Sequence, residues 1–552
     1  MRFRRLLISC AAVSLLAVGL VAQKAPSGPA GPGGPASIEP GELKEWLTYI
    51  ASDELEGRQI FTEGLGLASA YIASHLQEWG VKPGAPDGTY FQTVKVLGVK
   101  ASSHATVTVQ VGGQTRTFKD GEGITFPRNM GAKQTITGEQ IQFAGYGLQL
   151  PAARIDDYAT GSPKGKIVIY IGSGPKTDEP VGYRLLAARS RNAIEKGALA
   201  AIGAPTPGGR GRRAAAAAAP ADAPGASPAA GSSPAETPPA PAAAPTRGFT
   251  AQPDNGDFTT VQRYDVPVAP ALAARDDFFE FLFSGSDVTY AELKEKSQKQ
   301  EPLPTFALKG VKVTINVDAD YTVVRTRLTR NVVGIVPGTD ASLNDTYVAF
   351  GAHYDHIGYS ETGRLSGPPI SCPGQTRDTP REGDTINNGA DDDGSGTVAL
   401  MALAKAFALG PKPKRSVLLM WHSGEEAGLY GSRYNADHPV VPLDKMAAQL
   451  NIDMIGRNNC DDPKEENTVY IVGSDRISTE LHNLDEEANA SLATPMTLDY
   501  ALNDPADPES IYTRSDHYSY ASKGIPIIFY TTGLHKDYHY VTDEVSKIDF
   551  PK

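Results

Sequence analysis

Short, uninterrupted apolar runs alternate with helical stretches in the C-terminal half of the chain. Three such runs lie at 347–352, 417–421 and 525–529. Uniformly apolar runs of this length are typical of parallel strands that are buried on both faces. A helical stretch at 397–409 separates the first two and ends at Gly410-Pro411. The alternation predicts an α/β fold with a mainly parallel central sheet and helices on both faces, which we assign to residues 305–552.

Two further units are predicted in front of this one. Apolar side chains recur three or four positions apart at Leu43, Trp46, Leu47 and Ile50. This spacing indicates an amphipathic helix, and we interpret residues 38–137 as a segment that packs on the C-terminal unit. Residues 138–297 combine short strands with a helix and predict a smaller, β-rich α+β unit. Within it, residues 206–247 are almost entirely Ala, Pro, Gly and Ser, so we expect a disordered loop there.

The N-terminal residues have the pattern of an export signal. A basic start, Met1 to Arg5, precedes an apolar stretch that runs to Ala22. We predict a signal peptide over 1–22, a flexible leader over 23–37, and a secreted or periplasmic protein with no stable membrane insertion after cleavage. An uncleaved membrane anchor is the alternative. A lipoprotein is disfavoured, because Cys10 lies inside the apolar stretch.

Composition narrows the choice of partners. The chain has 552 residues, 40% of them apolar, and a net charge of −12. This length indicates more than one domain, and the acidic balance argues against nucleic acid as a partner. Once the signal is removed, Cys372 and Cys460 are the cysteines that remain. An even pair in an exported protein can form a disulfide, and the wide spacing argues against cysteine ligation of zinc.

Residue types that bind metals recur through the C-terminal unit, most of them at the end of an apolar run. They are His353, Asp355, Asp391, Asp392, Asp393, Glu425, Glu426, Asp453 and His539. Two imidazoles and several carboxylates suit two zinc ions, with one carboxylate left over as a base. Peptide or protein substrates fit such a site.

Position along the chain suggests a role for several of these residues. His353 directly follows a strand, and Asp355 is placed to orient it, as carboxylates orient metal-bound histidines. Asp392 lies in a triple-Asp turn, where one carboxylate with two oxygens can bridge two metals. Of the adjacent Glu425 and Glu426, one can bind metal while the other acts as the general base.

Each fragment alone also has a purely structural explanation. The acidic turns are typical helix N-termini, Asp453 can form a turn, and His539 can simply pack between its tyrosine neighbours. His356 is less favoured as a ligand. The hypothesis of a metal site gains weight because the fragments occur together.

Five motifs together resemble the M28 family of zinc peptidases, the group that contains secreted bacterial aminopeptidases. They are Ala-His-Tyr-Asp-His-Ile-Gly at 352–358, Gly-Ala-Asp-Asp-Asp-Gly-Ser-Gly at 389–396, Ser-Gly-Glu-Glu-Ala-Gly at 423–428, Asn-Ile-Asp-Met at 451–454, and the segment around His539. The resemblance implies a zinc exopeptidase fold with two Zn²⁺ per chain. It also implies a cis peptide bond between Asp392 and Asp393.

The same resemblance assigns roles within the site. His353 and Asp453 would hold one zinc ion, Glu426 and His539 the other, and Asp392 would bridge them. Glu425 would be the base. Residues 138–297 look like a protease-associated (PA) domain, and the segment with Leu55-Glu-Gly-Arg58 looks like the lead-in that some family members carry.

The function implied is a secreted metallo-aminopeptidase that hydrolyses N-terminal residues from peptides through a zinc-bridging water and Glu425. Tyr538 or Tyr540 are candidates to stabilise the oxyanion. An acidic rim suits a substrate ammonium, whereas a substrate carboxylate would need Arg457 or Arg514. Carboxypeptidase or dipeptidase action, a glutaminyl-cyclase-like transferase with a single zinc, and an inactive receptor-like binding protein are the alternatives. The oligomeric state is left open.

Overall fold

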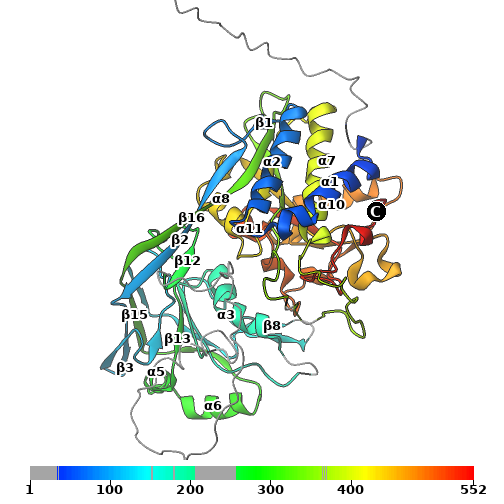
Figure 1. Ribbon diagram of the computed structural model, residues 1–552. Coiled ribbons are helices and arrows are strands. Elements are labelled where there is room, and N and C mark those ends of the chain that lie inside the picture. The colour runs from blue at the N-terminus through cyan, green and yellow to red at the C-terminus, as the bar shows by residue number, and fades with distance from the viewer. Residues whose placement is uncertain are drawn as a thin grey trace, which may run out of the picture.

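Two bodies joined by a pair of long strands make up the protein (Figure 1). The computed structural model describes residue 34 and residues 37–150, 153–177, 181–205, 256–363, 365, 367–368 and 370–552. The signal peptide predicted over 1–22 and the loop predicted over 206–247 lie outside these described residues. Within the described ranges, no helix has both the length and the apolar character that a bilayer span requires.

A ten-stranded sheet forms the centre of the larger body. Its middle consists of four parallel strands in the order β18 (Ser416–His422), β17 (Tyr347–His353), β19 (Met446–Ile452) and β22 (Ile527–Thr531). Antiparallel pairs extend it on one side through β16 (Ala319–Val336), β2 (Phe91–Ser103), β12 (Phe258–Thr260) and β1 (Lys82–Pro83). On the other side, β20 (Thr468–Val472) pairs antiparallel with β22 and parallel with β21 (Thr497–Asp499). The sheet is therefore parallel at its centre and mixed as a whole. Its parallel part comprises fewer strands than the mainly parallel sheet that we predicted.

Alternate residues of the buried strands enter two different cores. In β18, Leu419 and Trp421 pack in one hydrophobic cluster, whereas Leu418 and Met420 pack in the other. Successive side chains of a strand point to opposite faces, so an unbroken apolar run needs cover on both. Burying one such side chain contributes roughly 1.5–3 kcal/mol.

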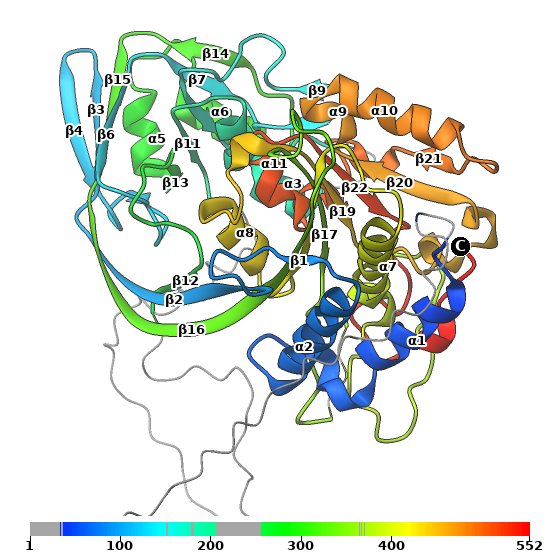
Figure 2. The same ribbon diagram turned by 90° about the horizontal axis from the view of Figure 1, so that it is seen from above.

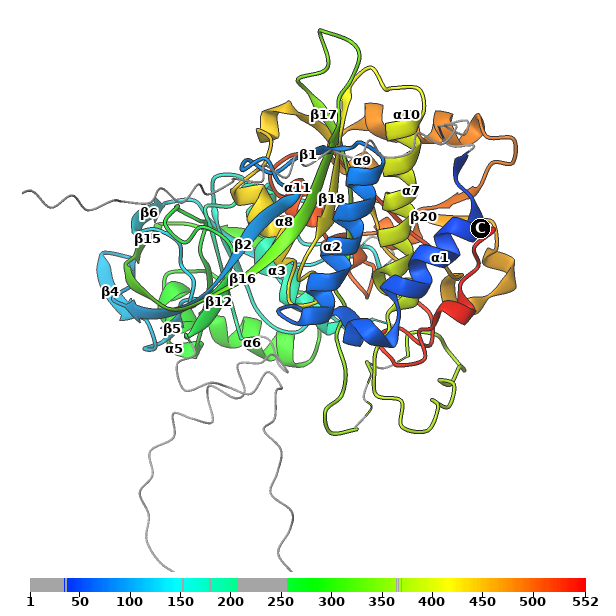
Figure 3. The same cartoon turned by 45° about the horizontal axis from the view of Figure 1, so that its top comes forward.

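Helices supply that cover on both faces of the sheet (Figures 2 and 3). The first face carries α7 (Gly396–Leu409), against which α1 (Pro40–Ile50) and α2 (Glu63–Glu78) pack. The second face carries α8 (Tyr430–Asp437) and α11 (His517–Ala521). Further helices in this body are α9 (Ser474–Ile477) and α10 (Thr479–Ala490). The N-terminal helices therefore pack on the C-terminal unit. The later part of the predicted segment 38–137, from Thr106 onward, belongs instead to the other body.

The smaller body is built on two sheets. The six-stranded sheet has the order β14 (Thr305–Leu308), β7 (Ile141–Ala144), β10 (Ile167–Tyr170), β11 (Ala200–Gly203), β13 (Ala271–Ala274) and β5 (Ile124–Thr125). The four-stranded sheet has the order β4 (Gln114–Lys119), β3 (Thr106–Val111), β15 (Val311–Val317) and β6 (Gln134–Gly138). The other elements are β8 (Gln149–Leu150), β9 (Ile155–Asp156), α3 (Tyr183–Glu195), α5 (Asp276–Leu282) and α6 (Tyr290–Gln298).

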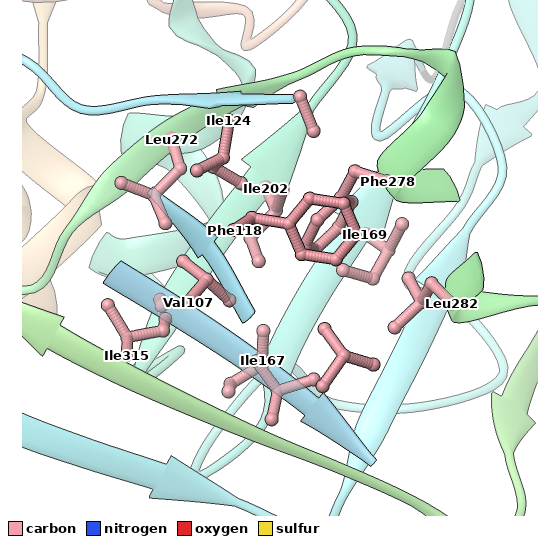
Figure 4. Packing of buried hydrophobic residues seen from close by; sticks show 14 of the residues in the cluster. Val107, Phe118, Ile124, Ile167, Ile169, Ile202, Leu272, Phe278, Leu282 and Ile315 are labelled. Atoms are coloured by element: carbon pink, nitrogen blue, oxygen red, sulfur yellow. The ribbon is translucent and has the colours of Figure 1, made fainter. Parts of the chain in front are cut away.

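One hydrophobic core joins the two sheets of the smaller body (Figure 4). Its side chains include Val107, Phe118, Ile167, Ile202, Phe278 and Ile315. The cluster runs from Ala105 to Ala319 and so extends beyond the predicted unit at 138–297 on both sides. Strands β3 to β6, up to residue 138, and β14 and β15, after residue 297, belong to these two sheets, where their apolar side chains are buried. Assignment of this body as a PA domain stays a prediction.

A disulfide links Cys372 to Cys460, with their Cα atoms 5.3 Å apart. Cys372 lies in the long connection between β17 and α7, and Cys460 lies after β19. The Cys460 N–H donates to the carbonyl oxygen of Leu534 at 2.8 Å, close in sequence to His539. The bond therefore ties together connections that carry candidate site residues.

Candidate metal centre and active site

The candidate ligands gather at the carboxyl edge of the parallel strands. His353 is the last residue of β17, Asp453 directly follows β19, and Glu425 and Glu426 follow β18. Asp392 lies in the turn η4 (Ala390–Ser395) that leads into α7. Loops at the carboxyl ends of neighbouring parallel strands meet at the same edge of a sheet, which is where sites form in open α/β folds.

Asp392 lies between the two histidines. Its Oδ1 atom is 3.2 Å from Nε2 of His353, and its Oδ2 atom is 3.0 Å from Nε2 of His539. Each carboxylate oxygen thus faces a different imidazole, which is the arrangement that a bridging ligand needs. The peptide bond from Asp392 to Asp393 is cis, as the resemblance implied.

The remaining predicted ligands divide between the two sides of Asp392. On one side, the Asp453 carboxylate lies 3.7 Å from Nε2 of His353. On the other, Oε2 of Glu426 lies 2.9 Å from Nε2 of His539. The structure therefore brings together all five residues that the sequence proposed as ligands, grouped in the pairs that the resemblance implied.

Glu425 and Asp355 lie beside this group. Oε2 of Glu425 is 4.0 Å from Nε2 of His353. The Asp355 carboxylate is buried, lies 3.8 Å from Nδ1 of His353, and accepts hydrogen bonds from the N–H groups of Gly424 and Glu425 at 2.7 and 3.1 Å. Asp355 thus contacts both the first histidine and the turn that carries Glu425. Nδ1 of His353 forms its hydrogen bond with the main-chain carbonyl oxygen of Asp355 at 3.1 Å, whereas the carboxylate that the sequence predicted to orient the ring lies farther away.

His356, which the sequence analysis considered less favoured as a ligand, is a member of the site. It is buried, and its Nδ1 atom lies 2.8 Å from Oε1 of Glu426. His356, Asp392 and Glu426 form one compact set of ligand atoms, and His353, Asp393 and Asp453 form a second. The motif His-Tyr-Asp-His contains both histidines, so the signal was present, but spacing alone could not show which ring faces the carboxylates.

Other side chains hold the ligands from behind. Ser515 donates to Oδ2 of Asp453 at 2.6 Å. The Asp393 carboxylate accepts from the N–H of His353 at 3.1 Å, and Asp543 accepts from the N–H of Asp392 at 3.1 Å. These contacts join residues far apart in the sequence, and no local pattern announces them.

The electrostatics of the site are those of many buried carboxylates close together. Burial raises the pKa of Glu425 well above its usual range, and Glu426 and Asp453 raise it further against the influence of His353. Burial alone would lower the pKa of His539, but the carboxylates of Glu426 and Asp392 raise it to about 11. Like charges in a dry environment destabilise each other strongly unless cations compensate them.

The residues fit divalent cations. Imidazole nitrogens and carboxylate oxygens are the donors that zinc accepts. Nδ1 of His356 and Oε1 of Glu426 are buried and lie 2.8 Å apart, but at an angle outside hydrogen-bond geometry, so neither has a hydrogen-bond partner among the described residues. Buried polar atoms of this kind are rare in proteins unless they serve a ligand or an ion.

A pocket opens beside Asp392, Glu425 and Asp453. Its apolar wall consists of Met454, Leu502, Ile511, Phe529 and Leu534. Arg514 and Tyr538 also line the pocket. Arg514 donates to the Tyr538 hydroxyl at 2.9 Å and to Glu509 at 3.0 Å.

The other three residues that the sequence proposed for substrate or oxyanion binding lie in different places. Tyr538 stacks on His539 with ring centroids 3.9 Å apart. Tyr540 instead contacts Arg377, whose guanidinium carbon lies 4.8 Å from the ring centroid. Arg457 pairs with Asp461 and Asp537 and does not line the pocket.

Comparison with known proteins gives a consistent result. Residues 331–552 match the model of peptidase family M28. The chain is 27% identical over 229 residues to a probable leucine aminopeptidase of Arthroderma otae, covering 40% of this chain and 52% of that protein. It is 36% identical over 95 residues to leupeptin-inactivating enzyme 1 of Streptomyces exfoliatus, covering 15% and 22%. The chain thus spans at most about half of the length of these two curated relatives.

Among solved structures, the aminopeptidase from Aneurinibacillus sp. strain AM-1 is similar at 16% identity and a TM-score of 0.39, covering 93% of this chain and 90% of that one. The matched region 331–552 contains every residue of the site described above. Residues 331–552, which carry the site, are therefore similar to peptidase family M28.

Proposed function

We propose that this protein is an exported zinc aminopeptidase that removes N-terminal residues from peptides. The observation that carries the proposal is the position of Asp392, whose two carboxylate oxygens face His353 and His539 at 3.2 and 3.0 Å. A curated relative named as a leucine aminopeptidase adds support. Export rests on residues 1–22 alone and is tested by sequencing the N-terminus of the protein recovered outside the cell, which we expect near residue 23.

Five residues would hold the metal ions. His353 and Asp453 would hold one zinc ion, Glu426 and His539 the other, and Asp392 both. Zinc in such a site polarises the scissile carbonyl and lowers the pKa of a coordinated water. His356 is close enough to Glu426 to orient its carboxylate or to bind the same metal ion.

The proton transfers are assigned to Glu425. Its carboxylate lies beside the candidate ligands, 4.0 Å from Nε2 of His353. It would accept a proton from the attacking water and return it to the leaving amine, the usual work of a positioned general base. Asp355, through its hydrogen bonds to Gly424 and Glu425, would fix the turn that presents this carboxylate.

The pocket would receive the first residue of the substrate. Its wall of Met454, Leu502, Ile511, Phe529 and Leu534 favours an apolar side chain. The carboxylates of Glu425 and Asp453 at the pocket mouth suit a substrate ammonium. The Tyr538 hydroxyl, held by Arg514, would donate to the oxyanion that forms at the cleaved bond.

One observation favours a second candidate function. Arg514 lines the pocket and carries a positive charge that could instead bind a substrate carboxylate, as a carboxypeptidase or dipeptidase requires. The competing view is that Glu509 and Tyr538 already occupy its donors.

A panel of peptides decides between the two candidates. A leucine-containing tripeptide is supplied unblocked, with an acetylated N-terminus, or with an amidated C-terminus. We expect cleavage of the unblocked and amidated forms and none of the acetylated form. Cleavage of the acetylated form together with loss on amidation would replace the aminopeptidase with a carboxypeptidase.

A further inference from the structure

Arg58 is a charged residue buried inside the larger body. Its side chain is 0% exposed, and it is the last residue of η2 (Asp53–Arg58), between α1 and α2. It lies outside residues 331–552, which carry the family match. Arginine is almost never fully buried unless its donors are satisfied, so its hydrogen bonds indicate its role.

The guanidinium group donates to main-chain carbonyl oxygens on both sides of the site. Nε donates to Tyr354 at 3.0 Å, Nη1 to Asn388 at 2.7 Å, and Nη2 to Gly389 at 3.0 Å. Nη1 also donates to Ile50, the last residue of α1, at 2.6 Å. Tyr354 lies between the candidate ligand His353 and Asp355. Gly389 is the residue before η4, the turn that carries Asp392. One planar group thus spans the two chain segments whose ligands face each other.

The main chain around Arg58 makes the same connection. The His356 N–H donates to the carbonyl oxygen of Arg58 at 3.2 Å, and the Gly358 N–H donates to that of Gly57 at 3.0 Å. Gly57 has a φ of +67°, and a Cβ atom there would lie 2.5 Å from the carbonyl oxygen of Asn387. Only glycine permits this approach, so the segment is shaped to fit against both loops.

Arg58 also contributes charge. Burial lowers its pKa to about 10, against the influence of Asp355, Asp392 and Asp393. The guanidinium group is therefore protonated at neutral pH and offsets part of the negative charge of the site.

We infer that Arg58 is a positioning residue of the metal centre, holding the loop with His353 and the turn with Asp392 at the separation that metal binding needs. The inference rests on the proposed function, because it assumes that these residues bind zinc. The lesser alternative is that Arg58 only anchors the N-terminal helices to the larger body.

Full-length variants separate the two possibilities. Arg58→Ala and Arg58→Lys are compared with Arg189→Ala, a matched control in the smaller body. Arg189 is also buried, at 1% exposed, and its guanidinium group also donates to main-chain carbonyls, those of Leu186, Tyr146 and Gly172. Zinc affinity is measured by competition with a chromogenic chelator, and the geometry of the site by the visible absorption of the Co²⁺-substituted protein.

We expect Arg58→Ala to bind zinc about 10–100-fold more weakly than the wild type, the range usual for residues that orient ligands. Its cobalt spectrum should change, Arg58→Lys should be intermediate, and added guanidinium ion at non-denaturing concentration should restore part of the affinity of Arg58→Ala. Arg189→Ala should lose stability but keep wild-type zinc affinity and spectrum.

Arg58→Ala with the zinc affinity and cobalt spectrum of the control would overturn the inference. If circular dichroism shows that Arg58→Ala does not fold, Arg58→Lys decides: wild-type affinity and spectrum in that variant would overturn it equally. A wild-type protein that binds no zinc would refute the proposed function itself, and the inference with it.

Discussion

The Glu425 N–H donates to Oδ1 of Asp355 at 3.1 Å, so the proposed base is held through its own main chain by the carboxylate next to the first ligand histidine. Asp355 lies two residues after the end of β17, and Glu425 lies in the turn after β18. These two strands are paired in parallel, ending with His353 opposite His422. The register of one strand pair therefore sets the position of the base relative to the ligands.

Replacing Glu425 tests whether the base is a different residue from the metal ligands. We expect Glu425→Gln to lower kcat by about 10²–10⁴, the range usual for loss of a general base, while zinc content stays as in the wild type. Glutamine keeps the size of the side chain but cannot accept the proton. Steady-state kinetics and metal analysis on the same preparation make the measurement, and near-wild-type turnover in a metal-replete variant would rule out Glu425 as the base.

Two neighbouring tyrosines provide a matched pair for the oxyanion assignment. Tyr538 lines the pocket and Tyr540 does not. We expect Tyr538→Phe to lower kcat by about 10²–10³, as loss of an oxyanion donor does, with little change in zinc affinity, because the ring that stacks on His539 is retained. Tyr540→Phe should have almost wild-type kinetics. The reverse ranking of the two variants would move the assignment to Tyr540.

The disulfide should contribute to stability more than to chemistry. It closes a loop across a sequence separation of 88 residues, and we expect Cys372→Ala/Cys460→Ala to lower the free energy of unfolding by about 2–4 kcal/mol. Urea unfolding with and without reductant checks this. Reductant should lower the wild-type midpoint to that of the double variant and leave the variant unchanged. Two free thiols in the denatured, unreduced wild type would contradict the bond.

Residues 206–247 should be dispensable for catalysis. Their composition of Ala, Pro, Gly and Ser cannot bury a core. We expect a deletion of this segment to keep zinc content and activity on small substrates within about twofold of the wild type. If the segment makes no packing contacts, its deletion removes none from the folded domains. Thermal unfolding of the deletion variant serves as the control, and loss of zinc or of the folding transition would give the segment a structural role.

The sequence predicted that several candidate site residues lie together, because they follow apolar runs that are typical of buried strands. His353 after 347–352 and Glu425 after 417–421 are of this kind, and the parallel pairing of those strands brings them together. The helices of residues 38–137 were also predictable, because their amphipathic spacing is local.

Relationships between distant segments were not predictable in the same way. The strands Thr106–Val111 and Val311–Val317 alternate cleanly, but their pattern does not say which sheet they join, and they pair with each other in the smaller body. The sequence did not show the contacts of Arg58, because its acceptors are main-chain oxygens, which leave no trace in the sequence. His356 could not be ranked against His353, since ring orientation depends on tertiary contacts.

The most direct test of the central claim is the number of zinc ions that the full-length protein binds as its activity returns. Protein stripped with a chelator is titrated with zinc while native mass spectrometry counts bound metal and a free-amine leucyl-anilide reports hydrolysis. The account predicts loss of activity on stripping, two zinc ions per chain at saturation, and full activity only in that state, because Asp392 faces both histidines. Full activity with a single zinc ion, or activity that survives complete removal of metal, would contradict it.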